Sequence, residues 1–174
     1  GKTLPWGNLT GIRPAKLAMA MIEAGMKNSE IAEEMRKRYL VSPEKTALAI
    51  TIANRERAIL KDIDYENGYS LYVGIPFCPS ICLYCSFSSY PLKQWKDRVE
   101  LYLDALCKEI REVSSIMKKK GRKLDTVYIG GGTPTTLEPD QLQRLLDTLT
   151  EHFDCRNLAE FTIEAGRPDS ITRE

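Results

Sequence analysis

The chain has 174 residues, 43% of them hydrophobic, and its 25 basic and 24 acidic side chains leave a net charge of +1. This balance predicts a globular protein and argues against the broad basic surface that a nucleic-acid partner or an anionic membrane requires. Apolar runs stay well short of the roughly 20 residues that cross a bilayer, and the first residues lack the apolar core of a secretory signal, so we expect a cytoplasmic location.

Residues 1–66 are predicted to form a small helical segment. Amphipathic helical patterns occupy residues 13–25, 28–40 and 42–60. We expect Asn28 or Ser29 to cap the second helix and Ser42 the third, because a side-chain oxygen there accepts a hydrogen bond from the first turn. The apolar positions of the third helix include Leu48, Ile52 and Ile59. The polar stretch "KDIDYENGYS" marks the predicted boundary to a second segment, residues 67–174.

In this second segment strands alternate with helices. Strand patterns occupy residues 70–75, 125–131 and 160–165, and helical patterns occupy residues 98–119 and 138–153. This order predicts three parallel strands in an α/β fold, the beginning of a doubly wound sheet or of a barrel. In both architectures ligands gather at the carboxyl ends of the strands. We therefore expect the cysteine-rich segment after the first strand, "GGGTPT" after the second and Glu164 on the third to share one rim.

Three of the five cysteines, Cys78, Cys82 and Cys85, lie within eight residues of "GIPFCPSICLYC". They are too close together for an ordinary disulfide framework, and an odd cysteine count favours a reducing compartment. A structural zinc site needs a fourth ligand, which this segment does not supply. A redox dithiol needs only two cysteines, so it leaves the third cysteine unexplained. An iron–sulfur cluster held by three thiolates explains the set better, because its fourth iron then keeps an open position for a substrate.

The remaining candidate ligands have simpler explanations. Cys107 lies in an amphipathic helical pattern and Cys155 at a helix end, where free cysteines are commonly small buried apolar residues. His152, the single histidine, is predicted to be an exposed or half-buried surface residue. A zinc site completed by Cys107 or Cys155 stays open as the less favoured alternative.

The cysteine segment resembles the signature of the radical S-adenosylmethionine superfamily, C-x-x-x-C-x-x-C after a first strand with the aromatic Tyr84 before the third cysteine. Together with "VYIGGGTPTTL", residues 69–172 are similar to the oxygen-independent coproporphyrinogen III oxidase family, also called coproporphyrinogen dehydrogenase, and to its haem-chaperone relatives. The leader, with "PWGNLTGIRPAKL" and "YLVSPEK", resembles the helical extension of a branch found in anaerobic bacteria. The resemblance implies that residues 67–174 form the first half of a partial (β/α)6 TIM-like barrel, the radical core domain.

The resemblance also assigns roles to individual residues. It implies that Cys78, Cys82 and Cys85 hold a four-iron four-sulfur cluster whose open iron chelates the amino and carboxylate groups of S-adenosylmethionine. It implies further contacts to this cofactor from Tyr72, Tyr84, Gly131, Gly132, Thr133 and Glu164. Glycines suit such a role because they let main-chain polar groups approach a ligand closely. Taken singly, the glycine stretch could be an ordinary turn, Tyr72 a strand-packing residue and Glu164 a solvated carboxylate.

The chemistry that the resemblance implies is radical. A reduced cluster, served by an electron donor such as a flavodoxin or ferredoxin, cleaves S-adenosylmethionine to a 5′-deoxyadenosyl radical that removes a hydrogen atom from the substrate. In this family the substrate is a small molecule, coproporphyrinogen III, whose propionate groups are oxidatively decarboxylated to give protoporphyrinogen IX on the way to haem. The cofactor carries this chemistry, and the protein positions and shields it.

Some positions depart from the family pattern. Phe87 stands where well-characterised decarboxylases carry a fourth cysteine, which the haem-chaperone relatives also lack, and Gly74 replaces a family histidine. For Arg167 in "EAGRPD" two roles stay open: it binds a carboxylate of the cofactor or substrate, or it faces solvent. A haem carrier, a radical enzyme with another substrate and a zinc-stabilised interaction domain therefore stay open as alternatives. Because the chain begins without Met and stops at "SITRE", we expect it to be part of a longer protein.

Overall fold

The computed structural model describes residues 4–11 and 13–171, and the chain divides between Asp62 and Ile63 into two compact units. Each unit has a hydrophobic core of its own. The boundary predicted from the sequence, between residues 66 and 67, lies slightly further along the chain, just before the first strand.

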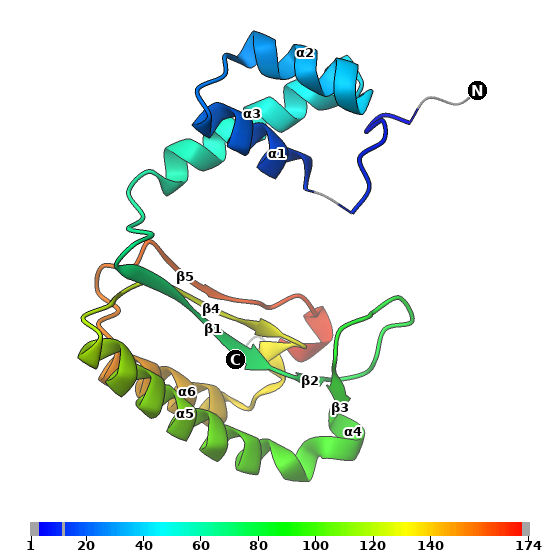
Figure 1. The fold of residues 1–174 in the computed structure, drawn as a ribbon. Coiled ribbons are helices and arrows are strands. Elements are labelled where there is room, and N and C mark those ends of the chain that lie inside the picture. Colours follow the sequence, from blue (N-terminus) through cyan, green and yellow to red (C-terminus); the bar gives the residue numbers. More distant parts are fainter. Residues whose placement is uncertain (1–3, 12, 172–174) are drawn as a thin grey trace. The chain divides into compact units, whose positions relative to one another are not determined.

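The first unit contains three helices, α1 (Pro14–Glu23), α2 (Asn28–Tyr39) and α3 (Pro43–Leu60) (Figure 1). Its core includes Ile31 and Met35 of α2, which are fully buried. In α3 the buried side chains are mainly small ones such as Ala49 and Ala53. The larger apolar positions noted in the sequence, Leu48, Ile52 and Ile59, are 43%, 37% and 75% exposed. Small residues let neighbouring helix backbones approach closely, which explains why α3 turns this face inward.

The helix caps confirm one prediction and correct another. Ser42 caps α3, its Oγ accepting a hydrogen bond of 3.3 Å from the main-chain N–H of the third helical residue. The cap of α2 is Lys27, and neither Asn28 nor Ser29 fills this position. The carboxylate of Glu30, the third residue of the helix, accepts a hydrogen bond from the Lys27 main-chain N–H at 2.7 Å. The helix therefore begins at Asn28, one residue earlier than a cap at Asn28 would place it.

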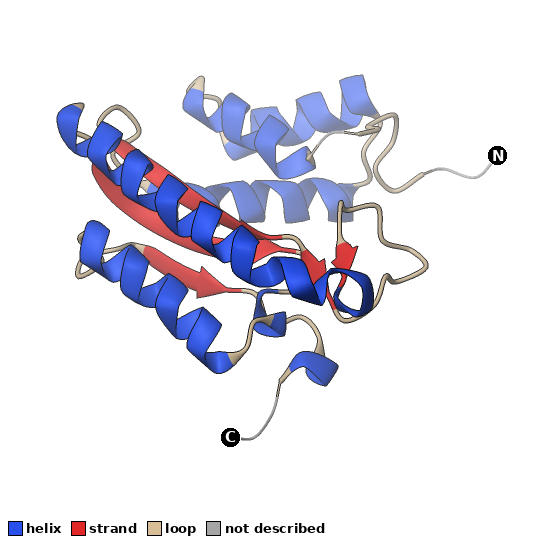
Figure 2. Ribbon diagram, turned by 90° about the horizontal axis from the view of Figure 1, so that it is seen from below, coloured by secondary structure: helices blue, strands red, loops and turns tan. Residues whose placement is uncertain are grey.

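The second unit contains a three-stranded parallel sheet in the order β1-β4-β5. Its strands are β1 (Gly68–Ile75), β4 (Lys123–Gly131) and β5 (Glu160–Ile163), and two helices, α5 (Val99–Lys119) and α6 (Pro139–His152), connect them. Both helices lie on the same face of the sheet (Figures 1 and 2). The predicted α/β fold with three parallel strands is confirmed, and its continuation into a six-stranded barrel stays a prediction.

Side chains alternate between the two faces of this sheet, as the pleat of a strand requires. Val73, Val127 and Ile129 face the helices, where they form the core with residues such as Leu103 and Leu145. On the opposite face, Tyr72 pairs in register with Tyr128, and Tyr128 with Thr162. Tyr72 is 61% exposed, whereas the side chains on the helix-covered face are buried.

Short elements absent from the sequence-based prediction bracket the cysteine-rich segment. β2 (Phe77–Cys78) pairs in parallel with β3 (Tyr90–Pro91), which leads into α4 (Leu92–Trp95). Short 3-10 turns occupy Lys96–Arg98 (η1), Pro134–Thr136 (η2) and Pro168–Ser170 (η3). We call residues 79–89, which lie between β2 and β3, the cysteine loop. Within the described residues, none of the helices has both the length and the apolar character needed to cross a membrane.

Candidate functional site

A cavity of about 460 Å³ lies at the carboxyl ends of the three parallel strands. Its lining residues are Cys78, Ser80, Cys82, Tyr84, Cys85, Ser89, Gly132, Thr133, Glu164, Ala165, Gly166 and Arg167. Every residue predicted for the site lines this cavity except Tyr72 and Gly131. Gly131 directly precedes the lining residue Gly132, and Tyr72 lies on β1. The structure thus places the three sequence features on one rim, as the strand-end rule led us to expect.

The cysteine loop is held at its base and supplies two of the three thiols, and the third, Cys78, lies in β2 directly before it. The main-chain N–H of Tyr90 donates to the carbonyl of Pro76 at 2.8 Å, which closes the loop. Cys78 is buried, whereas Cys82 and Cys85 are half-buried and share a turn in which the Cys85 N–H donates to the Cys82 carbonyl at 3.0 Å. Tyr84 is 90% exposed, and its contact with the Cys82 sulfur raises the pKa of the Tyr84 hydroxyl.

The glycine-rich stretch at the end of β4 is hydrogen-bonded to the segment that leads from β1 into the cysteine loop. Gly131 has a φ of +107°, a conformation that favours glycine. The N–H groups of Gly132 and Thr133 donate to the carbonyls of Ile75 and Phe77, both at 2.8 Å. A Cβ on Gly132 would lie 2.6 Å from the Phe77 carbonyl oxygen and 3.0 Å from the Cys78 sulfur. Glycine is therefore needed at position 132 for this close approach.

Glu164 is oriented by a tyrosine that the sequence analysis missed. The Tyr128 hydroxyl donates to Glu164 Oε1 at 2.6 Å, and this hydrogen bond, together with burial, raises the pKa of Tyr128. The Tyr128 ring stacks on that of Tyr72, with centroids 5.9 Å apart and planes inclined by 11°. Tyr72 thus connects to the cavity through Tyr128. The signal in the sequence was the alternation in "DTVYIGG", which puts Tyr128 on the same face as Gly130.

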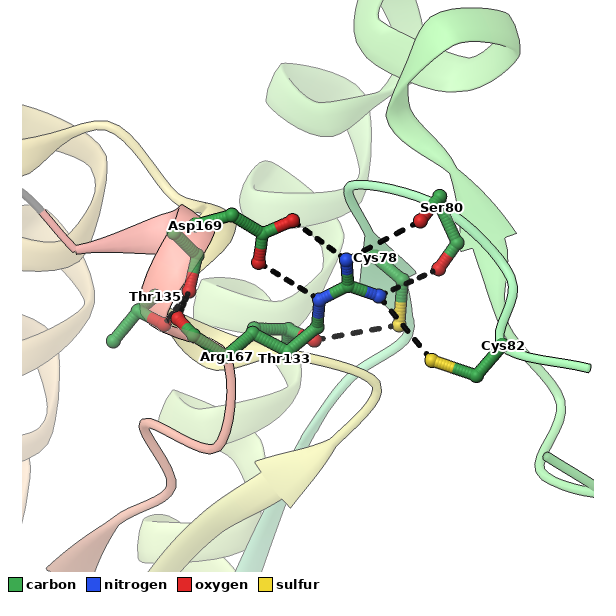
Figure 3. A network of polar contacts seen from close by, with 8 residues as sticks. Cys78, Ser80, Cys82, Thr133, Thr135, Arg167 and Asp169 are labelled. Carbon is green, nitrogen blue, oxygen red and sulfur yellow. Dashed lines mark hydrogen bonds and ion pairs between the residues drawn. The ribbon is translucent and has the colours of Figure 1, made fainter. Parts of the chain in front are cut away.

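Arg167 lies between the end of β5 and the cysteine loop (Figure 3). Its Nε and Nη2 donate to the Asp169 carboxylate at 2.9 and 2.6 Å. Nη1 donates to the Ser80 carbonyl at 3.2 Å and to the Cys82 sulfur at 3.3 Å, and Nη2 also donates to Ser80 Oγ at 3.2 Å. The Asp169 carboxylate raises the pKa of Arg167, and in return Arg167 lowers the pKa of Asp169.

The other two cysteines lie away from the cavity. Cys107 is buried between α5 and α6, where the Thr148 hydroxyl donates to its sulfur at 3.5 Å. Cys155 is half-buried against the core, and burial raises the pKa of its thiol. His152 is half-buried, within the range predicted for a surface residue. None of these three residues lines the cavity described above.

The thiols are arranged around the cavity and do not meet at one point. Among the described residues, no three side chains of cysteine, histidine, aspartate or glutamate converge as a single metal ion would require. A larger groove of about 710 Å³ lies in the first unit, but its lining has no thiol and its charged residues are Glu33 and Arg36.

No family model matches the chain, but individual proteins do. It is 39% identical to the oxygen-independent coproporphyrinogen-III oxidase-like protein HemZ of Bacillus subtilis over 176 residues, covering 100% of this chain and 35% of that protein. It is 40% identical to the heme chaperone HemW of the same organism over 106 residues, covering 60% and 27%.

The oxygen-independent coproporphyrinogen III oxidase of Escherichia coli is 36% identical over 129 residues, covering 73% of this chain and 27% of that protein. The solved structure of coproporphyrinogen III oxidase (HemN) from Escherichia coli, a radical SAM enzyme, aligns with a TM-score of 0.46 and 35% identity over 63% of this chain and 24% of the other. The chain thus spans between about a quarter and a third of the length of these three curated relatives.

Proposed function

Because this chain belongs to the family of the oxygen-independent coproporphyrinogen III oxidases, within the radical S-adenosylmethionine superfamily, we propose that it binds a four-iron four-sulfur cluster and S-adenosylmethionine. The observation that carries the proposal is a single cavity that joins three thiols, a glycine-rich loop and Glu164 at the ends of three parallel strands. Each of these features is weak by itself, and their meeting in one place favours a cofactor site.

Cys78, Cys82 and Cys85 are the proposed ligands of the cluster. Their donor chemistry fits, because thiolates hold iron–sulfur clusters. The shape fits as well, since the three thiols line one cavity and Gly132 leaves free the volume that a Cβ would fill 3.0 Å from the Cys78 sulfur. Three thiolates on a four-iron cluster leave one iron without a protein ligand, and this is where S-adenosylmethionine would be held.

The remaining site residues are proposed to bind S-adenosylmethionine. Gly131, Gly132 and Thr133 form the loop beside Cys78 that would receive the methionine end. Glu164, fixed by Tyr128, would accept hydrogen bonds from a polar group of the same molecule. In this proposal, contacts from Tyr72 and Tyr84 complete the cofactor site.

We assign the activity to the oxidative decarboxylation of coproporphyrinogen III to protoporphyrinogen IX, following the relatives that carry this name. When bound, the cluster would supply the electron that cleaves S-adenosylmethionine, and the resulting 5′-deoxyadenosyl radical would remove a hydrogen atom from the substrate. The residues of this chain would hold the cofactor in place and exclude water from it. A flavodoxin or ferredoxin is the proposed electron donor, and a six-stranded barrel the proposed frame around the substrate.

The experiment that tests this function uses the full-length protein, loaded with iron and sulfide in the absence of oxygen. We expect a four-iron four-sulfur content, formation of 5′-deoxyadenosine from S-adenosylmethionine under a strong reductant, and release of carbon dioxide from coproporphyrinogen III in proportion. Changing Cys78, Cys82 or Cys85 to Ser should abolish the cluster. The matched changes Cys107→Ser and Cys155→Ser should leave it intact, because these thiols lie outside the cavity.

Three results would contradict parts of the proposal. Binding of zinc in place of iron, or loss of the cluster in Cys107→Ser alone, would overturn the ligand assignment. Formation of 5′-deoxyadenosine with no change in the porphyrinogen would mean that the substrate is another molecule. Stoichiometric haem binding with transfer to an acceptor protein would instead identify a haem carrier.

A further inference from the structure

Arg167 has every one of its donors in use. A guanidinium carries five N–H groups, and the side chain makes five hydrogen bonds, to Asp169, Ser80 and Cys82. Its side chain is 24% exposed. To bind a carboxylate of a cofactor or substrate, Arg167 would have to give up contacts that it already makes. It does not face solvent freely either, because most of the side chain is covered.

The position of Arg167 is itself fixed by the polypeptide around it. The hydroxyl of Ser170, in the turn η3, donates to the Arg167 carbonyl at 2.7 Å and shares a 2.6 Å hydrogen bond with Thr135 of η2 (Figure 3). The loop after β4 therefore holds the segment after β5, and Arg167 in turn holds the cysteine loop through both the carbonyl and the hydroxyl of Ser80. Three segments that are distant in the sequence are tied together at this point.

Arg167 also places a positive charge beside one of the proposed cluster ligands. Of the described residues that line the cavity, it is the only basic one, and it donates to the Cys82 sulfur. Hydrogen bonds to the ligand sulfurs and nearby positive charge both favour the more electron-rich reduced state of an iron–sulfur cluster. Cys78 receives a second such hydrogen bond, from the Thr133 hydroxyl at 3.4 Å, and this one adds no charge.

We propose that Arg167 is a positioning residue that clamps the cysteine loop through Ser80 and raises the reduction potential of the cluster through Cys82. The effect on potential rests on the proposed function, because it requires a cluster at this site. The clamp does not, because its contacts are made by the polypeptide alone. The two parts can therefore be tested separately.

The clamp is tested in the full-length protein without a cluster, by hydrogen exchange of the cysteine loop in Arg167→Gln. We expect faster exchange across residues 79–89 than in the unchanged protein. The control is Arg156→Gln, since Arg156 also forms a two-point pair with an aspartate two residues away, Asp154, but is 84% exposed and lies outside the cavity. Equal exchange of the loop in Arg167→Gln and Arg156→Gln would overturn the clamp.

The electronic effect is tested by redox titration of the cluster, followed by electron paramagnetic resonance. We expect Arg167→Gln to lower the ratio of reduced to oxidised cluster at least tenfold at a fixed potential, which for one electron is a shift of about 59 mV. Arg167→Lys keeps the positive charge but loses the planar set of N–H donors that reaches both Ser80 and Cys82. Its midpoint potential should therefore fall between those of the unchanged protein and Arg167→Gln. Arg156→Gln should titrate like the unchanged protein.

Each outcome of the titration decides the electronic effect. If Arg167→Gln titrates at the potential of the unchanged protein, the electronic role is wrong. If Arg167→Gln takes up no cluster, the midpoint of Arg167→Lys decides instead, with a lower value supporting the proposal and an unchanged one overturning it. An unchanged protein that binds no cluster at all would overturn the proposed function, and the hydrogen-exchange comparison would still decide the clamp.

Discussion

Tyr128 shows how a single side chain links the packing of the sheet to the candidate site. Its ring stacks on Tyr72 of the neighbouring strand β1, and its hydroxyl donates a hydrogen bond to Glu164, which directly follows the other neighbouring strand, β5. A Cβ on Gly130 would lie 2.9 Å from the Tyr128 ring and 3.0 Å from Glu164 Oε2. A glycine at position 130 therefore leaves room for the contact, and the direction of the Glu164 carboxylate is set by the protein before any ligand binds.

The hydrogen bond between Tyr128 and Glu164 predicts a pH dependence. It raises the pKa of Tyr128 above the ordinary value of about 10. The folded state thus holds the phenol proton more tightly than the unfolded state does. Its contribution to stability is fully present below the unfolded pKa and is lost as the pH rises through the raised one. We expect Glu164→Gln to lower the pKa of Tyr128 toward its ordinary value, as measured from the Tyr128 ring signals by nuclear magnetic resonance.

Glu160 provides the matched control for this titration. It also raises the pKa of Tyr128, but through charge alone and less than Glu164 does. Glu160→Gln should therefore shift the Tyr128 titration less than Glu164→Gln. Equal shifts in the two variants would show that general negative charge, and not the hydrogen bond, sets the pKa.

At the residue scale, the sequence was informative wherever chemistry depends on spacing along the chain. The positions of Cys78, Cys82 and Cys85, and of Glu164 at the end of a strand, could be predicted to share a rim, and they do. The orientation of Arg167 could not be predicted, because it depends on Ser80, which is 87 residues away in the sequence. Contacts of this kind arise from the folded backbone and leave no local pattern.

At the scale of elements, the site is built where two loops cross. The glycine stretch after β4 donates two main-chain hydrogen bonds to the segment that leads from β1 into the cysteine loop. That segment is also paired with β3 through the two-residue strand β2. The segment directly before the cysteine loop is therefore held on both sides, and it contains the buried Cys78, whereas the half-buried Cys82 and Cys85 lie in the loop itself.

The loop crossing predicts different effects for two glycines of the same cavity. Gly132→Ala would place a methyl group 2.6 Å from the Phe77 carbonyl oxygen, so the loops must separate, and Cys78 with them. We expect a loss of about 1–3 kcal/mol in the free energy of unfolding, the usual cost of overpacking, and a lower iron content after loading. Chemical denaturation and iron analysis measure the two effects.

Gly166→Ala is the control for this prediction. Gly166 lines the same cavity, but a Cβ there meets nothing within 4 Å. The Gly166→Ala variant should therefore have the same free energy of unfolding and the same iron content as the unchanged protein. Equal behaviour of Gly132→Ala and Gly166→Ala would mean that the loops adjust easily and that their crossing does not hold the site.

The sequence predicted long elements better than short ones. The helical patterns and the three strands were found because amphipathic and alternating patterns need several residues to become visible. β2 and β3 have two residues each, which is too short for any pattern. In α3 the apolar positions noted in the sequence did not show which face is buried, because the buried side chains include the small Ala49 and Ala53.

At the scale of the whole molecule, the chain has two separate cores. The first gathers Ile31, Met35 and their neighbours in the helical unit, and the second gathers the inner faces of the sheet and of α5 and α6. Among the described residues, none belongs to both cores. Since burial of apolar side chains is the main source of stability, a defect in one core is expected to act on its own unit.

Leu145 and Met35 allow a direct test of this independence, because each is fully buried in a different core. Removing a large buried side chain costs about 2–5 kcal/mol, through the lost burial and the cavity that remains. We expect Leu145→Ala to lower the free energy of unfolding of residues 63–174 by this amount and to leave the helical unit unchanged, and Met35→Ala to do the reverse. Hydrogen exchange at increasing denaturant concentration reports on each unit separately. If either change destabilised both units equally, the two cores would unfold as one cooperative structure, and the cavity at the strand ends would depend on the helical unit for its stability.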